Sequence, residues 1–335
     1  MATVPTTTPV PAGSPPRPTP PLLDLLRGAW DDPARRGSVA GGAGALGLLA
    51  VLFWQNLVHF VQVWSTDENY SHGFLVPFLS LYFANEAARR GPVAVRAGVG
   101  LGSALLGLAL GIKLATVVVP FPAASDYGLL LALAGAVAVL AGTNVLRRYW
   151  FAIFFLVFMV PLPVALYTLI ANPLQLMVSQ MATAMLNVLN IPALCEGNLI
   201  TLPGDNQLFV AEACSGMRQL TGFLALTAAW AYLSGRPAWH RGLLIASSVP
   251  IAMTANIVRV TLTGVVSHGL DPKYASGAFH TVEGLAMMGL GLLMLSTFSW
   301  ALDQVIVLTR PARDAGPAEA QPAPRAAIAT PELVA

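Results

Sequence analysis

Long apolar runs separated by short polar segments fill the chain between residues 39 and 308. Several of these runs reach the ~20 residues that an α-helix needs to cross a bilayer, and the second and fourth are shorter. The candidate spans are 39–63, 72–88, 95–119, 127–143, 149–171, 215–234, 242–267 and 280–308. This pattern predicts an all-α polytopic membrane protein with about eight transmembrane helices.

Two further stretches differ from simple spans. Residues 172–191 carry amide and hydroxyl side chains among apolar ones, which is typical of an interfacial or re-entrant helix. Residues 192–213 contain short apolar runs on either side of a turn at 203–206. This arrangement predicts a small β-hairpin in an external loop.

The two ends of the chain differ in composition from the apolar region. Residues 1–38 form an N-terminal tail that is rich in proline and threonine at its start, where we expect disorder. A short surface helix is expected over 22–37, and the first apolar run lies too far into the chain for a cleavable signal peptide. Residues 309–335 are rich in proline and alanine and are expected to form a disordered C-terminal tail. The transmembrane domain therefore covers 39–308.

Basic residues recur at every second boundary between spans. Fourteen of the 18 lie before the first span, after every second span or after the last: Arg17, Arg27, Arg35, Arg36, Arg89, Arg90, Arg96, Arg147, Arg148, Arg236, Arg241, Arg310, Arg313 and Arg325. The opposite loops carry Asp67, Glu68, Asp126, Glu196, Asp205, Glu212 and Asp271, with Lys273 as their basic residue. Because positive charge accumulates on the cytoplasmic side, this alternation predicts that both termini are cytoplasmic. Seven or nine spans would break the alternation.

The overall composition agrees with a membrane protein. Hydrophobic residues make up 56% of the chain and charged residues 10%, whereas a soluble domain carries about 25% charged residues. A net charge of +2 gives no indication of a nucleic-acid partner. Two cysteines are too few for a disulfide framework.

Cys214 lies in "AEACSGMRQL" (211–220), at the outer start of the sixth predicted span. A helix N-terminus stabilises a thiolate, and Arg218 follows one turn later on the same face. Two alternatives remain open at this point. Cys214 could be an inert small apolar residue, or it could form a disulfide with Cys195 outside the cytoplasm.

Arg259 is the most unusual residue of the seventh predicted span, because "IAMTANIVRVTLTGVV" is otherwise almost entirely apolar. An arginine inside a span costs several kcal/mol unless it is paired or hydrated, so it indicates a functional site. Asn256, one turn earlier, could brace its guanidinium. Alternatively, Arg259 extends to the interface or pairs with an acid such as Glu283 or Glu212.

His280 opens the eighth predicted span in "SGAFHTVEGLAMM", and Glu283 follows one turn later, where it could orient the imidazole. A histidine that merely lies at the interface is the alternative. His268 and His72 are competing external histidines. No ligand-spaced pair of the HExxH kind is present in the sequence, so we expect neither a metal site nor a cofactor.

Cys214, Arg259 and His280 share one predicted membrane depth on three successive helices. A histidine can deprotonate a thiol and later protonate a leaving amine, and an arginine can stabilise an oxyanion. This set indicates thiol acyl-transfer chemistry of the cysteine peptidase or transpeptidase type. A serine mechanism is less favoured, because the chain has no GxSxG motif.

Four blocks of the sequence resemble the exosortase/archaeosortase family. They are "DENYSHGFLVPFLSLYF" (67–83), "AEACSGMRQL" (211–220), "NIVRV" (256–260) and "FHTVEG" (279–284). The resemblance covers roughly residues 40–308, and the order and spacing of the blocks make it specific.

The resemblance implies a multi-pass enzyme of the bacterial inner membrane whose active site faces the periplasm. Its substrates would be membrane-anchored proteins with a C-terminal sorting signal of the PEP-CTERM type: a short motif, a transmembrane helix and a basic cluster. The family's catalytic cysteine, arginine and histidine correspond to Cys214, Arg259 and His280. The acceptor nucleophile is unknown, with an amine on a lipid or glycan as one candidate, and the family is linked to exopolysaccharide and biofilm production.

Two other functions fit the sequence less well. One is an intramembrane cysteine protease that hydrolyses its substrate without transfer. The other is a non-enzymatic subunit for polysaccharide export or assembly, although the chain lacks the repeat symmetry that transporters usually show.

Overall fold

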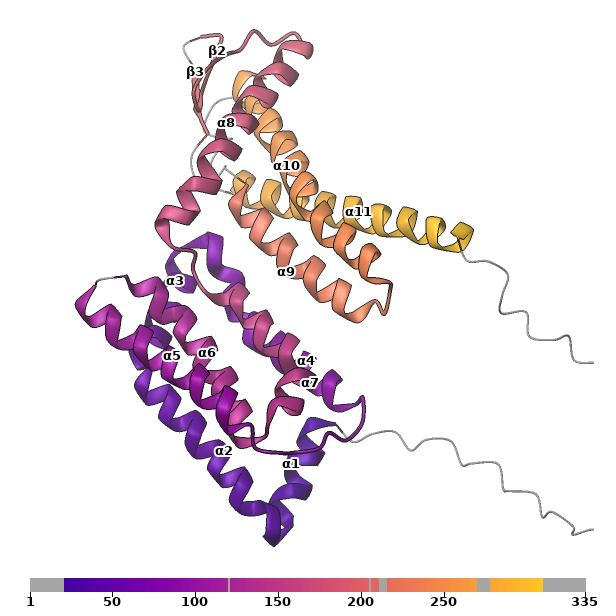
Figure 1. Cartoon of the computed structure of the whole chain (residues 1–335). Coiled ribbons are helices and arrows are strands. Elements are labelled where there is room, and N and C mark those ends of the chain that lie inside the picture. Colours follow the sequence, from indigo (N-terminus) through magenta and orange to yellow (C-terminus); the bar gives the residue numbers. More distant parts are fainter. Residues whose placement is uncertain (1–20, 120, 205, 211–215, 270–277, 310–335) are drawn as a thin grey trace, which may run out of the picture.

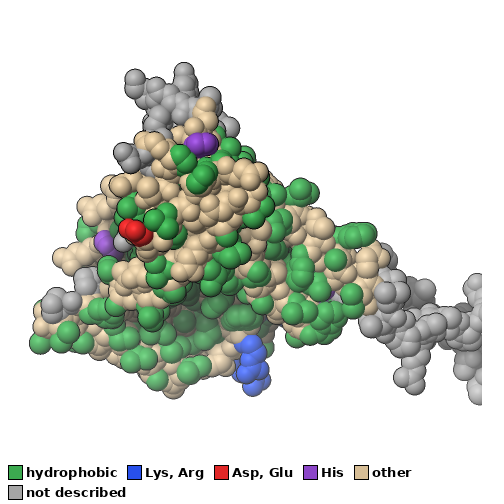
Figure 2. Space-filling view, turned by 90° about the horizontal axis from the view of Figure 1, so that it is seen from above, with side chains coloured by type: hydrophobic (Ala, Val, Ile, Leu, Met, Phe, Trp, Pro, Cys, Tyr) green, Lys and Arg blue, Asp and Glu red, His purple; other side chains and the backbone are tan. Residues whose placement is uncertain are grey.

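The computed structural model describes residues 21–119, 121–204, 206–210, 216–269 and 278–309. It is mainly helical, with one small antiparallel sheet. Figure 1 shows the helices of the first half gathered in one group, and α8 leading from them to the sheet and to α9, α10 and α11. The face in Figure 2 carries many hydrophobic side chains and few charged ones, as expected for a protein surrounded by lipid.

The first half of the chain consists of eight short and long helical segments. They are α1 (Leu22–Asp31), α2 (Pro33–Leu52), α3 (Trp54–Thr66), the 3₁₀ segment η1 (Glu68–Phe74), α4 (Val76–Ala88), α5 (Val99–Val118), α6 (Pro122–Leu140) and α7 (Thr143–Phe155). Glycines let α5 and α6 pack closely, because a Cβ at Gly102 would lie 2.7 Å from the backbone nitrogen of Val139. The short surface helix expected over 22–37 corresponds to α1 and the start of α2.

The second half contains the remaining helices and the sheet. These elements are η2 (Leu156–Met159), α8 (Val164–Val188), β1 (Leu194–Glu196), β2 (Leu199–Leu202), β3 (Asn206–Phe209), α9 (Met217–Leu233), α10 (Ala238–Gly269) and α11 (Ala278–Thr309). Tyr232 of α9 stacks on Phe151 of α7 with ring centroids 3.9 Å apart, beside the buried Phe83 and Phe155. This aromatic cluster joins the two halves of the molecule.

Within the described residues, four helices are long and apolar enough to cross a membrane, and up to six spans result if each bent helix pair counts as one. The first bent pair is α2 with α3, which meet at 70°, and the second is α7–η2 with α8, which meet at 75°. The expected span 72–88 is divided between η1 and the 13-residue α4, and the span expected at 215–234 forms the 17-residue α9. A polytopic helical protein is thus confirmed, whereas the number of eight spans stays a prediction.

The second bend has a clear cause in the sequence. Pro161 and Pro163 lie between η2 and α8, and proline lacks the N–H that would continue a helix. The break therefore falls at these prolines instead of near residue 171. The stretch 172–191, expected as a separate interfacial or re-entrant helix, belongs mostly to α8.

The expected hairpin is confirmed and is extended by one strand. β2 pairs antiparallel with β3 across the predicted turn, and β1 adds a third strand in the order β1-β2-β3. Ile200 of β2 is fully buried against Leu186 of α8 and Val260 of α10. The sheet therefore packs against α8, which precedes the "AEACSGMRQL" block in the chain, and against α10, which follows α9.

Candidate active site

Cys214 lies outside the described residues. The structure does describe Val210 and Gly216, the residues on either side of this segment. On one side, Gln175 of α8 donates a hydrogen bond from Nε2 to the carbonyl oxygen of Val210. Gln175 is buried, at 7% exposure. Its polarity inside an apolar helix was visible in the sequence, whereas its partner was not. The strand end that leads into the cysteine segment is thus held by α8.

On the other side, Gly216 forms the turn into α9. Its backbone is left-handed, with φ at +84°, a conformation that favours glycine. A Cβ at this position would lie 3.1 Å from Nδ2 of Asn256 in α10. Gly216 therefore serves two needs, the sharp turn and the close approach of the two helices.

Asn256 and Arg259 lie one turn apart on α10 and are both buried. Asn256 is 0% exposed and Arg259 is 5% exposed. Helix α10 packs against α8, α9 and α11, so both residues lie in the middle of this group of helices. Gly216, two residues after Cys214, thus lies beside Asn256, whereas the expectation that Asn256 braces the guanidinium of Arg259 stays a prediction.

Arg218, in the first turn of α9, forms an ion pair with Glu68 of η1. The Glu68 side chain is 74% exposed and that of Arg218 is 34% exposed, so the pair lies at the rim of the bundle. Arg218 is also close enough to Arg259 for the two charges to repel, and to Asp67 for attraction. Sequence reasoning placed Glu68 in the first family block but did not identify it as the partner of Arg218.

The η1 segment is held firmly against η2. The backbone N–H of Leu162 donates to the hydroxyl of Tyr70 at 3.0 Å, and Trp64 Nε1 donates to the carbonyl of Met159 at 2.9 Å. Burial raises the pKa of Tyr70 to about 12. His72 Nε2 lies 3.1 Å from the carbonyl oxygen of Phe158. These contacts fix the loop that carries Glu68.

The predicted histidine and its neighbour lie at the start of α11. His280 and Glu283 are the third and sixth residues of this helix, and their side chains lie outside the described part of the structure. The competing His268 is exposed in the last turn of α10, about 13 Å along the helix from Arg259. The joint placement of Cys214, Arg259 and His280 therefore stays a prediction.

Cys195 is a free thiol in β1, and its Sγ lies 3.3 Å from the carbonyl oxygen of Gly197. The structure thus gives no support to the alternative of a disulfide with Cys214. Among the residues that the structure describes, no three metal-ligating side chains come together.

Comparison with known proteins identifies the family. The chain matches the family of transmembrane exosortases over residues 64–297, which is more than half of its length. Neither the curated proteins nor the solved structures provide a match. The matched region includes Glu68, Arg218, Asn256 and Arg259, which the structure describes, and also Cys214 and His280. On this evidence the chain belongs to the transmembrane exosortase family.

Proposed function

We propose that this protein is a membrane-embedded cysteine transpeptidase that cleaves a C-terminal sorting signal of the PEP-CTERM type from exported membrane proteins. Its family supports the coarser part of this function, the processing of sorting signals on membrane-protein substrates. In the proposed reaction Cys214 is the nucleophile, Arg259 stabilises the oxyanion and His280 is the general acid and base. Arg218, Asn256 and Glu283 support these groups.

The proposed reaction has two steps. The thiolate of Cys214 attacks the scissile carbonyl carbon, and Arg259 lies near the negative oxygen of the tetrahedral intermediate. The carbon–nitrogen bond then breaks as protonated His280 gives its proton to the leaving amine, which leaves a thioester. An acceptor amine attacks the thioester and loses its proton to His280, and the thiolate is regenerated.

The observation that carries the proposal is the close approach of Gly216, at the start of α9, to the side chain of Asn256 in α10. Cys214 precedes Gly216 by two residues, so chain connectivity limits their Cα atoms to about 7.6 Å of separation. Arg259 is one turn beyond Asn256 on the same helix, within reach of that segment. Two cations close to a thiol favour its thiolate form, which is the reactive one.

The proposed topology completes the assignment. Eight spans with both termini in the cytoplasm place the site at the periplasmic face of the bacterial inner membrane. The alternation of basic residues supports this orientation. The link to exopolysaccharide and biofilm production belongs to the same proposal and concerns the exported substrates.

Trapping the thioester tests the proposal. A tagged membrane protein that carries a sorting signal is co-expressed, and the adduct on Cys214 is sought by mass spectrometry after acid quenching. We expect an adduct that hydroxylamine releases and that Cys214→Ala abolishes, with Cys195→Ser as the matched cysteine control. If Cys214→Ala still processes the substrate fully, the thiol mechanism is wrong and a non-enzymatic or different role remains.

The new C-terminus of the processed substrate separates transfer from hydrolysis. A transpeptidase leaves the mass of an acceptor on this terminus, and a lipid or glycan amine is the expected class. A free carboxylate in the presence of all membrane components would instead identify a protease that uses water.

A further inference from the structure

The side-chain amide of Gln219 is buried in the bundle without a hydrogen-bond partner for its oxygen. Gln219 is the third residue of α9 and is 7% exposed. Its Oε1 accepts no hydrogen bond from any residue that the structure describes. Buried polar atoms are almost always paired, and an unpaired one indicates strain, a bound water or a functional role. The reaction proposed above does not use this amide.

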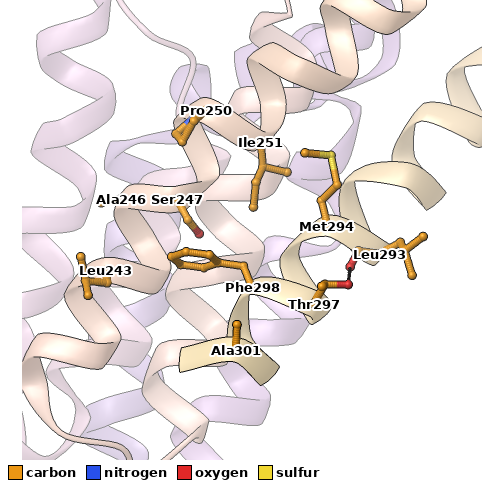
Figure 3. A pocket seen from close by; sticks show the side chains of 10 residues that line it. All are labelled: Leu243, Ala246, Ser247, Pro250, Ile251, Leu293, Met294, Thr297, Phe298 and Ala301. Carbon is orange, nitrogen blue, oxygen red and sulfur yellow. Dashed lines mark hydrogen bonds between the residues drawn. The ribbon is translucent and has the colours of Figure 1, made fainter. Parts of the chain in front are cut away.

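Other polar side chains of these helices form their hydrogen bonds within their own helix. On α9 the hydroxyl of Thr221 donates to the carbonyl oxygen of Met217 at 3.0 Å. In the apolar groove between α10 and α11, Thr297 donates in the same way to Leu293 at 2.8 Å (Figure 3). A hydroxyl is satisfied in this manner because a helix offers carbonyl oxygens one turn back. The Oε1 of Gln219 can only accept, so it needs a donor from another group.

Two close contacts between helices lie on either side of Gln219. Gly216, three residues earlier, approaches Asn256 of α10. Phe223, four residues later, packs on Gly291 of α11, where an added Cβ would overlap its ring. Residues three and four apart share one face of a helix. Gln219 therefore lies on the face of α9 that α10 and α11 cover, and this position accounts for its burial.

The side of α11 that faces α9 is open near Gln219. Gly284 precedes Gly291 by seven residues, or about two turns, so both lie on one face of α11. At Gly291 the ring of Phe223 fills this face, whereas a Cβ at Gly284 would meet nothing within 4 Å. The two helices run in the same general direction from neighbouring first turns (Figure 1). Because helical side chains lean toward the N-terminus, the amide of Gln219 extends toward the level of Gly284.

This open position is next to residues of the proposed site. His280 precedes Gly284 by one turn of α11, and Cys214 precedes Gly216 by two residues. A substrate segment that reacts with Cys214 has to leave its own helix, because the carbonyl of a helical residue is hydrogen-bonded and enclosed by its neighbours. The unwound backbone then needs hydrogen-bond partners, which lipid does not supply. An amide side chain offers both an acceptor and donors, as a peptide group does.

We infer that Gln219 binds the substrate backbone beside the scissile bond by accepting a hydrogen bond from one of its N–H groups, and this inference rests on the proposed function. The substrate thus supplies the donor that Oε1 lacks in the free protein. The unfavourable burial of an unpaired acceptor is relieved when substrate binds. Because the bond is made to the backbone, Gln219 favours an extended segment at this point without selecting its side chains.

Replacing the amide by an apolar group of similar length separates binding from folding. In the purified full-length protein, we expect Gln219→Met to leave the melting temperature unchanged or higher, because an unpaired buried acceptor is removed. In the Cys214→Ala background, its affinity for a synthetic peptide with a PEP-CTERM-type sorting signal should fall about tenfold, the effect of one hydrogen bond. Gln180→Met, at an exposed position of α8, is the matched control and should leave this affinity unchanged. A lower melting temperature with unchanged affinity would show that the amide serves the fold and would overturn the inference.

Ester substitution in the peptide identifies the donor. Each ester removes one backbone N–H, and the series covers the residues on both sides of the scissile bond, which the mass of the processed product locates. We expect one ester to weaken binding about tenfold when Gln219 is present and to have no further effect with Gln219→Met. If every ester acts equally with and without Gln219→Met, the amide does not bind the substrate backbone and the inference is wrong.

The pH dependence of cleavage tests for a role through His280 instead. In the protein that retains Cys214, Gln219→Met should lower kcat/KM about tenfold at every pH, because a backbone N–H does not titrate. A displaced pH profile would show that the amide orients the imidazole, which would contradict the inference. Affinity is measured without turnover, so the binding results stand on their own if no thioester forms on Cys214.

Discussion

In the first half of the bundle α3, α5 and α6 bring together groups of opposite charge, whereas α9 and α10 bring together two guanidiniums. Asn56 donates from Nδ2 to Asp126 at 2.7 Å and to Ser125 at 3.0 Å, and Lys113 donates to the side-chain oxygen of Asn56 at 2.7 Å. His59 Nδ1 lies 3.5 Å from Asp126. Asp126 is 1% exposed, and Lys113 and the hydrogen bond from Asn56 compensate its buried carboxylate within the protein.

The start of α9 has a different arrangement. Arg218 and Arg259 are close enough to repel, and the acid that pairs with Arg218, Glu68, is mostly exposed. Placing like charges together raises the energy of the folded state, and such an arrangement is typical of sites that bind or stabilise negative charge. We therefore expect the first network to stabilise the fold and the second to serve the proposed reaction.

Asp126→Ala should have the largest effect and should act on stability. Removing the carboxylate leaves Lys113 partly buried without its opposite charge, which costs about 3–5 kcal/mol of unfolding free energy in buried pairs. The measurement is thermal unfolding of the purified protein in detergent. We expect the protein that remains folded to process substrate at a rate close to that of the wild type.

The double variant Lys113→Met with Asp126→Leu is the control for this prediction. Because it removes both charges, most of the lost stability should return. A double variant as unstable as Asp126→Ala would show that the network contributes more than charge balance. A large loss of kcat in the folded fraction of Asp126→Ala would show that this network also affects the reaction, against the separation of the two networks.

Arg259→Gln should have the next largest effect and should act on the reaction. Loss of an oxyanion-stabilising group lowers kcat about 10²–10³-fold. The measurement is the rate of substrate cleavage together with alkylation of Cys214, which should still occur. Arg259→Lys retains the charge but loses the planar fork and should recover only part of the rate. A variant that is inactive because it no longer folds, as judged by its melting temperature, would contradict this assignment.

Much of the fold follows from local features of the sequence. Hydropathy predicts helices such as α5 and α10, and a turn flanked by short apolar runs predicts the pairing of β2 with β3. The bend before α8 also has a local signal in Pro161 and Pro163. In contrast, the 70° bend between α2 and α3 falls at Phe53 in a continuous apolar run without proline, so no local pattern indicates it.

The candidate site, too, could be predicted from the sequence only in part. Arg259 was identifiable because a charge in an apolar helix is costly. The pairing of Glu68 with Arg218 joins residues 150 positions apart, and no periodicity within one sequence specifies such a contact. The same holds for Gln175 and Val210, where the buried amide was visible but its acceptor depends on how α8 packs against the sheet.

Gly216→Ala should have a smaller effect, on both the stability of the protein and its cleavage rate. A side chain in the left-handed region costs about 1–2 kcal/mol, and its Cβ would press against Asn256. We expect a modest fall in melting temperature and a loss of cleavage rate of several-fold, since the turn after Cys214 is displaced. Gly222→Ala in α9 is the matched control, because a Cβ there meets nothing within 4 Å. Equal behaviour of the two variants would show that the turn does not position the cysteine segment.

Glu68→Gln should have the smallest effect. Exposed ion pairs contribute about 0–1 kcal/mol and weaken with salt, so we expect an unchanged melting temperature and at most about a fivefold loss of rate. The loss should disappear at high ionic strength. Adding Arg218→Gln to Glu68→Gln should lower the rate further, because Arg218 also favours the thiolate of Cys214 in the proposed site. Glu196→Gln, on exposed β1, is the control for a lost surface charge. A loss beyond tenfold that persists in salt would show that Glu68 contacts the substrate.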